Sequence, residues 1–280
     1  MSAEKIHIER NTVQETLIIP LFSRKLCTET FSDFFTDPKA IELMNRLDYD
    51  FSRLEQSSKG AVQKFASLEV ATRQKTFILE TKNYLKAHPK ASVVNLGCGL
   101  DQSGESCDNG SCRIYNVDFP DIIKIREELI PTGERVTNIS TDLNDLSWFE
   151  QVDRENGAVF FASGVFYYFT AEQMEKLING MAGYFHGGLL MFDISSRMTS
   201  KTMIKNWIKQ SGINDVFTGF YVDDVKKDIA SWLKHAKVSC RPYMTGYFDL
   251  HEKSITKLYH LGAWFADHCM KMKIIRIDFD

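Results

Sequence analysis

Long hydrophobic runs are missing from this sequence of 280 residues: its longest apolar segments, such as Ala158–Val165, have the length of a strand and are too short to span a bilayer. Charge of one sign is also scarce. The formal net charge is −3, and no long basic run offers a patch for nucleic acid or a membrane surface. The polar start, Met1–Lys5, lacks the apolar segment of a secretory signal peptide. We therefore expect a cytoplasmic protein with no nucleic-acid or membrane partner.

Closely spaced cysteine pairs are equally scarce. The six cysteines are irregularly spaced, and only Cys107 and Cys112 lie close together, separated by a polar segment. A zinc site would normally show tighter Cys-x-x-Cys pairs and more than two local ligands. We therefore predict no metal site and expect reduced thiols.

The composition that is present is ordinary for a globular protein, with 44% hydrophobic and 25% charged residues. A chain of this length suffices for one large domain, or for a core domain with a helical addition. Residues 1 to about 90 are predicted to be helical, because Pro38–Met44 and Val62–Leu85 place apolar residues at three- and four-residue spacing. His88 and Pro89 end the second of these helices before the first strand.

Short apolar runs then alternate with helix-like segments. The predicted strands are Ser92–Leu96, Ile114–Val117, Arg135–Ile139, Ala158–Ala162 and Gly188–Ile194. The predicted helices between them are Asp121–Leu129, Trp148–Val152 and Ala171–Phe185. Strands that alternate with helices indicate βαβ units and a parallel, doubly wound sheet.

The end of the chain has a different pattern. Met198–Phe220 is polar and aromatic and longer than an ordinary connection, so we expect it to cap the ligand edge of the sheet. A helix over Val225–Leu233, a strand over Lys237–Arg241 and a helix over Ile255–Met270 are predicted next. The closing Lys273–Phe279 alternates strictly, which is typical of a strand with one exposed face.

Aromatic residues of the cap have two readings. They either line an apolar site for a second ligand or form the hydrophobic core of the cap itself, and the sequence favours neither. These residues are Trp207, Phe217, Phe220 and Tyr221.

The most informative stretch is Val93–Asp101, an apolar strand that runs into a turn with two glycines, followed about twenty residues later by a second strand that ends on Asp118. In an open parallel sheet this places an accessible backbone turn beside a carboxylate at the strand carboxyl ends, where nucleotide-like ligands bind. Gly97 and Gly99 let the main chain approach a ligand closely. Asp118 can accept hydrogen bonds from a ribose diol, so the pattern indicates an adenosine-containing cofactor.

A nicotinamide dinucleotide is the less favoured cofactor. A dinucleotide-binding turn has the form Gly-x-Gly-x-x-Gly. Here Gly99 is followed by Leu100, Asp101 and Gln102, so the third glycine is absent.

Four segments together resemble the leucine carboxyl methyltransferase superfamily of class I S-adenosylmethionine-dependent enzymes, and within it the bacterial O-methyltransferases linked to polyketide biosynthesis. The resemblance covers about Arg73 to Ile178. The segments that carry it are Val93–Asp101, Asp118–Asp121, Asp142-Leu143 and Ala162–Phe169.

The resemblance implies a set of S-adenosylmethionine contacts. Arg73 would bind the cofactor carboxylate with a bidentate pair that lysine cannot copy, unless it is a solvated charge on a helix face. Asp118 would bind the ribose hydroxyls, with helix capping as the alternative. Asp142 would accept from the adenine amino group, unless it is a simple turn residue. The other implied contacts are Gly97, Cys98 and Gly99 at the methionine end, with an ordinary turn as the alternative, and Phe119, Leu143, Ser163 and Gly164.

Two segments depart from the family pattern. Gln102-Ser103 stands where many members have Thr-Arg, and Ser163-Gly164 stands where many have Glu-Gly. The absent glutamate argues against the protein-modifying branch of the family.

No catalytic base is named from the sequence. His186, His251 and His260 are possible bases, but each is more often an ordinary surface or core histidine. Tyr167 and Tyr168 are candidate substrate-binding residues, with core packing as the alternative. Because adjacent side chains of an extended segment point to opposite sides, we expect at most one of them to reach the pocket.

Pattern and resemblance together predict an α/β fold with a seven-stranded, mostly parallel, Rossmann-like methyltransferase sheet and helices on both faces. We expect residues 1–90 to form an N-terminal helical lid or substrate region, and residues 91–280 to form the cofactor-binding core with a cap insertion at about 198–222. The predicted activity is S-adenosylmethionine-dependent methyl transfer to a hydroxyl or carboxylate of a small, polyketide-like molecule. Two alternatives stay open: a noncatalytic S-adenosylmethionine-binding module, and methylation of a protein C-terminal carboxyl group.

Overall fold

The computed structural model describes residues 5–9, 12–202 and 219–280. Its helices are α1 (Ile18–Thr30), α2 (Pro38–Asn45), α3 (Ser52–Ser57), α4 (Ala61–Ala87), α5 (Pro120–Leu129), α6 (Ala171–Tyr184), α8 (Val225–Asp228) and α9 (Lys257–His268), and residues 197–202 are also helical. Its 3-10 helices are Val13–Leu17, Glu105–Cys107, Leu146–Gln151, Phe166–Tyr168 and Ala230–Trp232. Two short strands, β1 (Ile6–His7) and β2 (Leu47–Asp48), pair in parallel.

Seven further strands of the described residues form one sheet. They are β3 (Ser92–Leu96), β4 (Arg113–Asp118), β5 (Val136–Ser140), β6 (Ala158–Ala162), β7 (Leu189–Ile194), β8 (Ala236–Pro242) and β9 (Lys273–Phe279). Their order is β5-β4-β3-β6-β7-β9-β8, and β9 alone runs antiparallel to the other strands. This arrangement confirms the predicted seven-stranded, mostly parallel sheet. It differs from the 3-2-1-4-5-6 order of dinucleotide-binding sheets, because the last strand is inserted beside β7.

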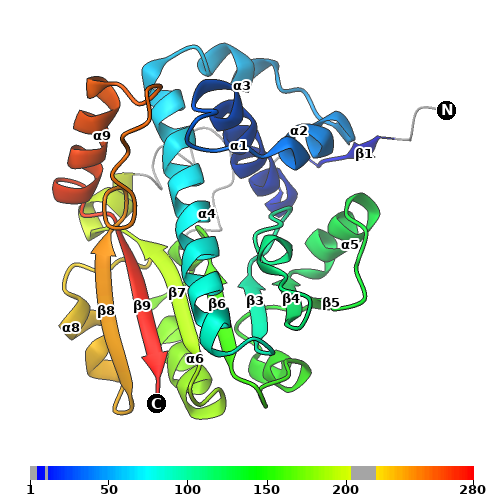
Figure 1. Cartoon of the computed structure of the whole chain (residues 1–280), viewed down its shortest axis with the longest axis vertical. Coiled ribbons are helices and arrows are strands. Elements are labelled where there is room, and N and C mark those ends of the chain that lie inside the picture. The colour runs from blue at the N-terminus through cyan, green and yellow to red at the C-terminus, as the bar shows by residue number, and fades with distance from the viewer. Residues whose placement is uncertain (1–4, 10–11, 203–218) are drawn as a thin grey trace.

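Helices cover both faces of the sheet, which is why β3, β6 and β7 are buried throughout. Alternate residues of a strand face opposite layers. Val94 and Phe160 pack with α6, whereas Val93 and Phe161 pack with α4 and α9. Figure 1 shows α4 crossing the front of the sheet with its C-terminal end at the starts of the strands.

The N-terminal helices occupy two positions. A third apolar cluster joins α1 and α2 to α5, through residues such as Ile18, Leu43 and Ile122. The long helix α4 instead packs directly on the sheet through Leu68, Ala71 and other apolar side chains. Residues before 90 therefore supply one layer of the core as well as the helices that lie outside it.

Several predicted elements differ in detail from the structure. The helix predicted over Val225–Leu233 ends at Asp228, because Asp224 caps only a single turn and a 3-10 turn follows. The helix predicted over Trp148–Val152 is a 3-10 helix. In β9, the expected exposed face carries half-exposed Arg276 and Asp278 but buried Ile274, because this strand lies inside the sheet and under α4.

The predicted cap falls mostly on residues 203–218, which lie outside the described residues and include Trp207 and Phe217. Phe220 is described and buried against Trp232, which matches the packing alternative for that side chain. Tyr221 is half-buried with the Arg197 guanidinium over its ring.

All six cysteines are free, and four of them are buried. Over residues 5–9, 12–202 and 219–280, no cluster of three or more His, Cys, Asp or Glu side chains is arranged to hold a metal ion. In the same residues, no helix combines the length and apolarity needed to cross a membrane.

Candidate functional site

Most of the predicted site residues meet at the carboxyl edge of the sheet. Because β4, β3, β6 and β7 are parallel neighbours, the segments that follow them lie side by side. This edge brings together the glycine turn after β3, Asp118 at the end of β4, Ser163-Gly164 after β6 and Asp193 near the end of β7.

The glycine turn requires glycine at both positions. Gly97 has φ +65° and Gly99 has φ +48°. A Cβ atom at Gly97 would lie 2.4 Å from Val165 Cγ2, and one at Gly99 would lie 3.0 Å from Leu17 Cδ2. The Gly97 and Cys98 amides both donate to the Val117 carbonyl, which fixes the turn against β4. These positions therefore have no room for a side chain, and the turn keeps a backbone conformation that glycine allows.

Asp118 is bound to this turn. Its Oδ2 accepts a hydrogen bond of 2.8 Å from the Gly99 amide, and its Oδ1 accepts one of 2.8 Å from the Phe119 amide. Burial raises the pKa of Asp118 to about 6, although both amides lower it. The N-cap of α5 is Phe119, so Asp118 does not cap that helix. Each carboxylate oxygen retains a lone pair for a ligand hydroxyl.

Arg73 points from α4 into the same edge. Its Nη1 donates to Asp193 Oδ2 at 2.8 Å, while Asp193 Oδ1 accepts from the Gly164 amide at 2.7 Å. Its side chain is only 12% exposed, so Arg73 is not a solvated charge on a helix face. Burial by itself would lower the pKa of Arg73, but Asp193 raises it above its usual value.

One edge of the Arg73 guanidinium has no partner within the described residues. Its Nε is buried without a hydrogen bond, and no described acceptor binds Nη2. The Nε–Nη2 edge is a fork that can hold a carboxylate with two parallel hydrogen bonds. Gly164, with φ +72°, leaves room for this group, because a Cβ there would lie 2.8 Å from Arg73 Nη1. These features fit the methionine carboxylate of S-adenosylmethionine.

The remaining predicted contacts are spread along the edge. Asp142 is exposed, and its Oδ1 accepts from the Asn144 amide and side chain, which is a turn geometry. Leu143 is buried and accepts from the Trp148 indole through its carbonyl. Phe119 is 43% exposed next to Asp118. Cys98 is buried, and Ser163 is half-buried.

The prediction that Tyr167 and Tyr168 lie on an extended segment is wrong, because they form a 3-10 turn after Val165. Tyr167 is buried within the main apolar cluster, and Tyr168 is half-buried against it. Burial raises the pKa of both phenols.

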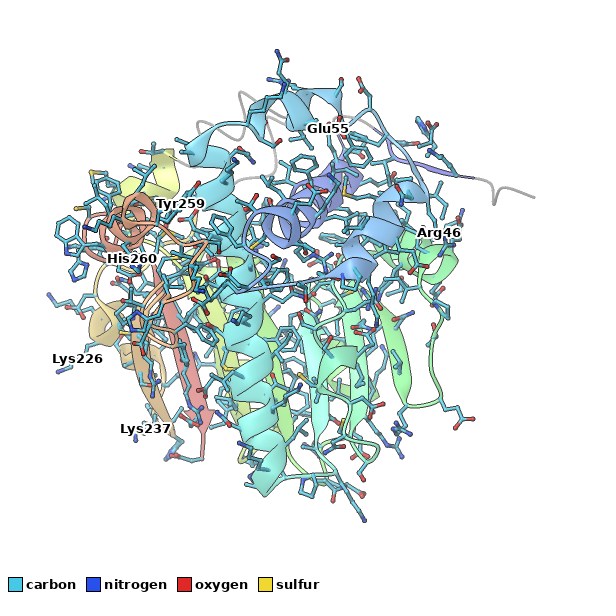
Figure 2. The ribbon with its side chains drawn as sticks, turned by 45° about the horizontal axis from the view of Figure 1, so that its top comes forward. Arg46, Glu55, Lys226, Lys237, Tyr259 and His260 are labelled. Carbon is cyan, nitrogen blue, oxygen red and sulfur yellow. The ribbon has the colours of Figure 1, made fainter. Side chains whose placement is uncertain are left out.

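In the described residues, no hydrogen bond or ion pair joins any of the three candidate histidines to the Gly97–Gly99 turn, Asp118 or Arg73. His186 precedes β7, at the opposite end of the strands, and its Nδ1 contacts the Asp280 carbonyl at 3.2 Å. His251 is exposed in the loop before α9. Figure 2 shows His260 on the flank of the molecule formed by α9, on the side away from Arg46.

Sequence reasoning missed Asp193, which anchors Arg73. The signal was available, because this carboxylate interrupts the otherwise apolar run Leu189–Ile194. It also missed Glu69, one helical turn before Arg73, for which the sequence carries no comparable signal.

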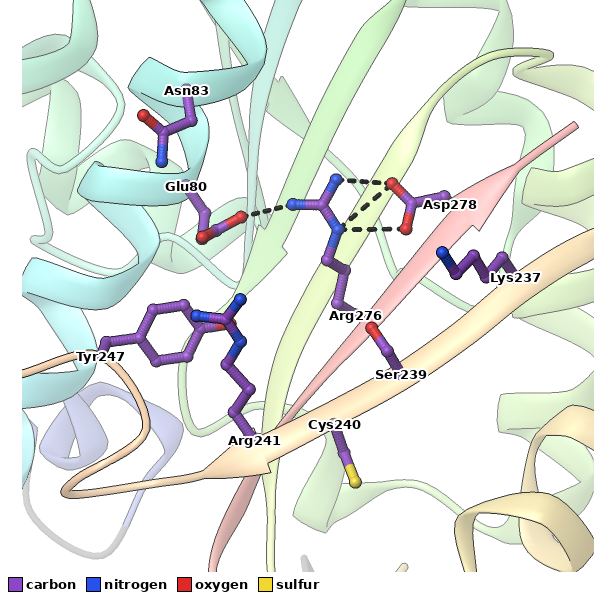
Figure 3. Close-up of a pocket in the computed structure, with 9 residues that line it drawn as sticks. All are labelled: Glu80, Asn83, Lys237, Ser239, Cys240, Arg241, Tyr247, Arg276 and Asp278. Carbon is purple, nitrogen blue, oxygen red and sulfur yellow. Dashed lines mark hydrogen bonds and ion pairs between the residues drawn. The ribbon is translucent and has the colours of Figure 1, made fainter.

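A separate cavity of about 500 Å³ lies between α4 and the β8–β9 edge (Figure 3) and contains none of the predicted site residues. Arg276 is held there between Glu80 and Asp278, so its charge is balanced within the protein.

The family model for leucine carboxyl methyltransferases matches residues 17–182 of this chain. A curated relative, the tetracenomycin polyketide synthesis O-methyltransferase TcmP of Streptomyces glaucescens, is 29% identical over 183 residues. This match covers 65% of this chain and 65% of the relative, so the chain spans slightly less than two thirds of the relative's length.

Solved structures share the fold. A candidate methyltransferase from Thermobifida fusca YX aligns with a TM-score of 0.57 at 8% identity, covering 76% of this chain and 82% of that one. A DUF574 family protein from Streptomyces avermitilis MA-4680 aligns with a TM-score of 0.54 at 10% identity, covering 92% and 97% of the two chains.

Proposed function

We propose that this chain, which belongs to the leucine carboxyl methyltransferase family, is an S-adenosylmethionine-dependent O-methyltransferase that acts on a small organic molecule. The observation that supports this most is the convergence of the Gly97–Gly99 turn, Asp118 and the open edge of Arg73 at one end of the sheet. When bound, S-adenosylmethionine supplies an electrophilic methyl group on a sulfonium centre.

The residues at this edge have distinct roles in the proposal. Arg73 holds the methionine carboxylate, and Asp193 and Gly164 keep the guanidinium in place. The glycine turn lines the methionine end with main-chain atoms. Asp118 accepts from the ribose diol, and Asp142, Leu143 and Phe119 lie at the adenine side. The protein thereby orients the donor and excludes water, which is the main requirement of methyl transfer.

The acceptor is a small, polyketide-like molecule in this proposal. Its support is the relative TcmP, whose name places that protein in tetracenomycin polyketide synthesis. The absence of the family's glutamate at Ser163 argues against a protein carboxyl terminus as the acceptor.

Calorimetric titration with S-adenosylmethionine, run beside NAD, tests the cofactor. We expect micromolar binding of the methyl donor and none of NAD. Asp118→Ala is expected to weaken donor binding at least about 100-fold, because two charge-assisted hydrogen bonds of about 1.5 kcal/mol or more each are lost. Asp121→Ala removes an exposed carboxylate three residues away and serves as the matched control. NAD binding, or equal effects of the two substitutions, would overturn the assignment.

Turnover tests the activity itself. The purified protein is expected to form S-adenosylhomocysteine only when a small acceptor is present. Donor binding with no product from any phenol, carboxylic acid or peptide would instead favour the noncatalytic binding module. Product with peptides alone would favour the protein-modifying alternative.

A further inference from the structure

We propose that Glu69 takes the proton from the methyl acceptor, so the accepting group is a hydroxyl and not a carboxylate. The inference rests on the proposed methyltransferase function and assigns a catalytic base that the sequence did not reveal.

The first support is the position of Glu69 on α4. Residues four apart lie on the same helix face, so Glu69 projects beside Arg73, one turn nearer the N-terminus. The C-terminal end of α4 precedes β3, so its N-terminal half lies at the carboxyl ends of the parallel strands (Figure 1). Arg73 reaches Asp193 near the end of β7, so Glu69, one helical turn nearer the N-terminus of α4, lies at the same carboxyl edge of the sheet.

The second support is that the Glu69 carboxylate has no hydrogen-bond or ion-pair partner in the described structure. Glu69 is half-buried, and no described residue donates a hydrogen bond or forms an ion pair with its carboxylate. Its backbone is nevertheless fixed, because the Tyr243 hydroxyl donates to the Glu69 carbonyl at 3.1 Å. A positioned helix residue with an uncommitted carboxylate is a suitable proton acceptor.

The third support is the charge around Glu69. On its own helix the nearest cation is Arg73, which is neutralised by Asp193 of β7. From α9 it faces Asp267, whose oxygens accept from the Met244 and Thr245 amides and from the Thr245 hydroxyl. From the loop before α9 it faces Tyr243, whose burial raises its phenol pKa.

These neighbours leave Glu69 able to exchange a proton near neutral pH. Burial raises the pKa of Glu69 to about 7, with Arg73 lowering it and Asp267 raising it. A general base works best when its pKa lies close to the operating pH.

The proton balance of the step is simple. The acceptor O–H bond breaks and its proton passes to a Glu69 oxygen. The same acceptor oxygen forms a bond to the methyl carbon, while the electron pair of the broken carbon–sulfur bond stays on sulfur in the neutral thioether product. Glu69 then releases the proton to water, which restores the ionised base.

The same charges disfavour a carboxylate acceptor. Within the described residues, Glu69 lies near Asp267, and the charge of the neighbouring Arg73 is already paired with Asp193. A carboxylate acceptor placed against the ionised Glu69 would be repelled by it and would need no base, whereas the donor carboxylate lies on the open edge of Arg73. A neutral hydroxyl is not repelled, and its proton neutralises Glu69.

The experiment compares Glu69→Gln with the wild type on two probes of one ring system, 2-naphthol and 2-naphthoic acid. We expect the wild type to methylate 2-naphthol in preference to 2-naphthoate. Glu69→Gln is expected to lower 2-naphthol kcat/KM about 100-fold, in the range of general base catalysis, and to remove the ionisation near pH 7 from its pH profile. Donor affinity and Tm should not change, and Glu69→Asp should retain part of the rate.

The matched control is Glu55→Gln, the same substitution at an exposed position of α3 (Figure 2), which should alter nothing. An unchanged 2-naphthol rate in Glu69→Gln overturns the proposal, as does preferred methylation of 2-naphthoate. A loss of donor affinity also overturns it, because Glu69 would then bind the donor ammonium.

One further outcome is that the wild type binds the donor but methylates neither probe. In that case, an NMR titration of ¹³C-labelled carboxyl groups in the donor complex tests whether Glu69 can act as the base. A signal absent from Glu69→Gln that titrates near pH 7 supports the base, and one that titrates below about pH 5 overturns it. If the proposed methyltransferase function is wrong, the wild type will not bind S-adenosylmethionine. This result differs from a failure of the Glu69 proposal, in which the wild type still binds the donor.

Discussion

The two halves of the site are built differently. In the β3–β4 half, the contacts are between residues close in sequence: the Gly99 amide and Asp118 are 19 residues apart. In the α4–β7 half, Arg73 and Asp193 are 120 residues apart, and the Tyr243 hydroxyl reaches the Glu69 carbonyl across 174 residues. The first half depends on backbone hydrogen bonds and strand register, whereas the second depends on side chains brought together by packing.

This difference predicts where each half is vulnerable. A turn held by main-chain bonds is sensitive to added side-chain volume and to changes in backbone conformation. A buried ion pair is sensitive to loss of one partner, because the other charge is left without compensation.

The largest expected effect is the loss of stability when the Arg73–Asp193 ion pair of the α4–β7 half is broken. Asp193→Ala should lower the free energy of unfolding by about 3–5 kcal/mol, because it leaves the Arg73 charge buried and the Gly164 amide without its acceptor. Urea denaturation measures this. Asp278→Ala in the adjacent β9 breaks a more exposed ion pair with Arg276 and should cost about 1 kcal/mol or less. Equal losses for the two variants would contradict the role of Asp193.

The β3–β4 half should respond to Gly97→Ala. The φ of +65° costs about 1–3 kcal/mol for a residue with a Cβ, and the contact with Val165 adds to it. Adding Val165→Ala to this variant should relieve the steric clash, but the strain from the positive φ should remain. Gly183→Ala on α6, where a Cβ meets nothing within 4 Å, should instead stabilise the protein by about 0.5–1 kcal/mol. Destabilisation of the same size at both glycines would contradict this account.

The smallest expected effect is a pH dependence of donor binding, which should come from Asp118 in the β3–β4 half and not from the α4–β7 half. Because burial raises the pKa of Asp118 to about 6, this carboxyl becomes protonated as the pH falls from 7 to 5 and accepts fewer hydrogen bonds from the ribose diol. Donor binding should weaken about tenfold over that interval. Calorimetry in the Glu69→Gln variant isolates Asp118 from the titration of Glu69. Asp118→Asn should bind weakly at both pH values, and a persisting pH dependence there would contradict the assignment.

All seven strands of the large sheet were predicted close to their observed bounds, including the half-exposed closing strand Lys273–Phe279. Ser92–Leu96 and Ala158–Ala162 were predicted with the bounds that the structure shows, because continuous apolar runs between helices have few other placements. The helix over Val225–Leu233 was predicted too long, because short-range spacing does not reveal that Asp224 caps a single turn. Tyr167 and Tyr168 were wrongly placed on an extended segment, because the 3-10 turn depends on packing of Phe166 and Tyr167 against the sheet.

The sequence by itself determined the individual strands and the Gly97–Gly99 turn, because apolar periodicity and the φ requirements of Gly97 and Gly99 act over a few residues. Only the tertiary structure decided the partner of Arg73 and the surroundings of Glu69. Those contacts exist because β7 pairs beside β6 and α4 packs across both, which brings Asp193 under Arg73. Such pairings follow from the arrangement of whole layers, and no local segment encodes them.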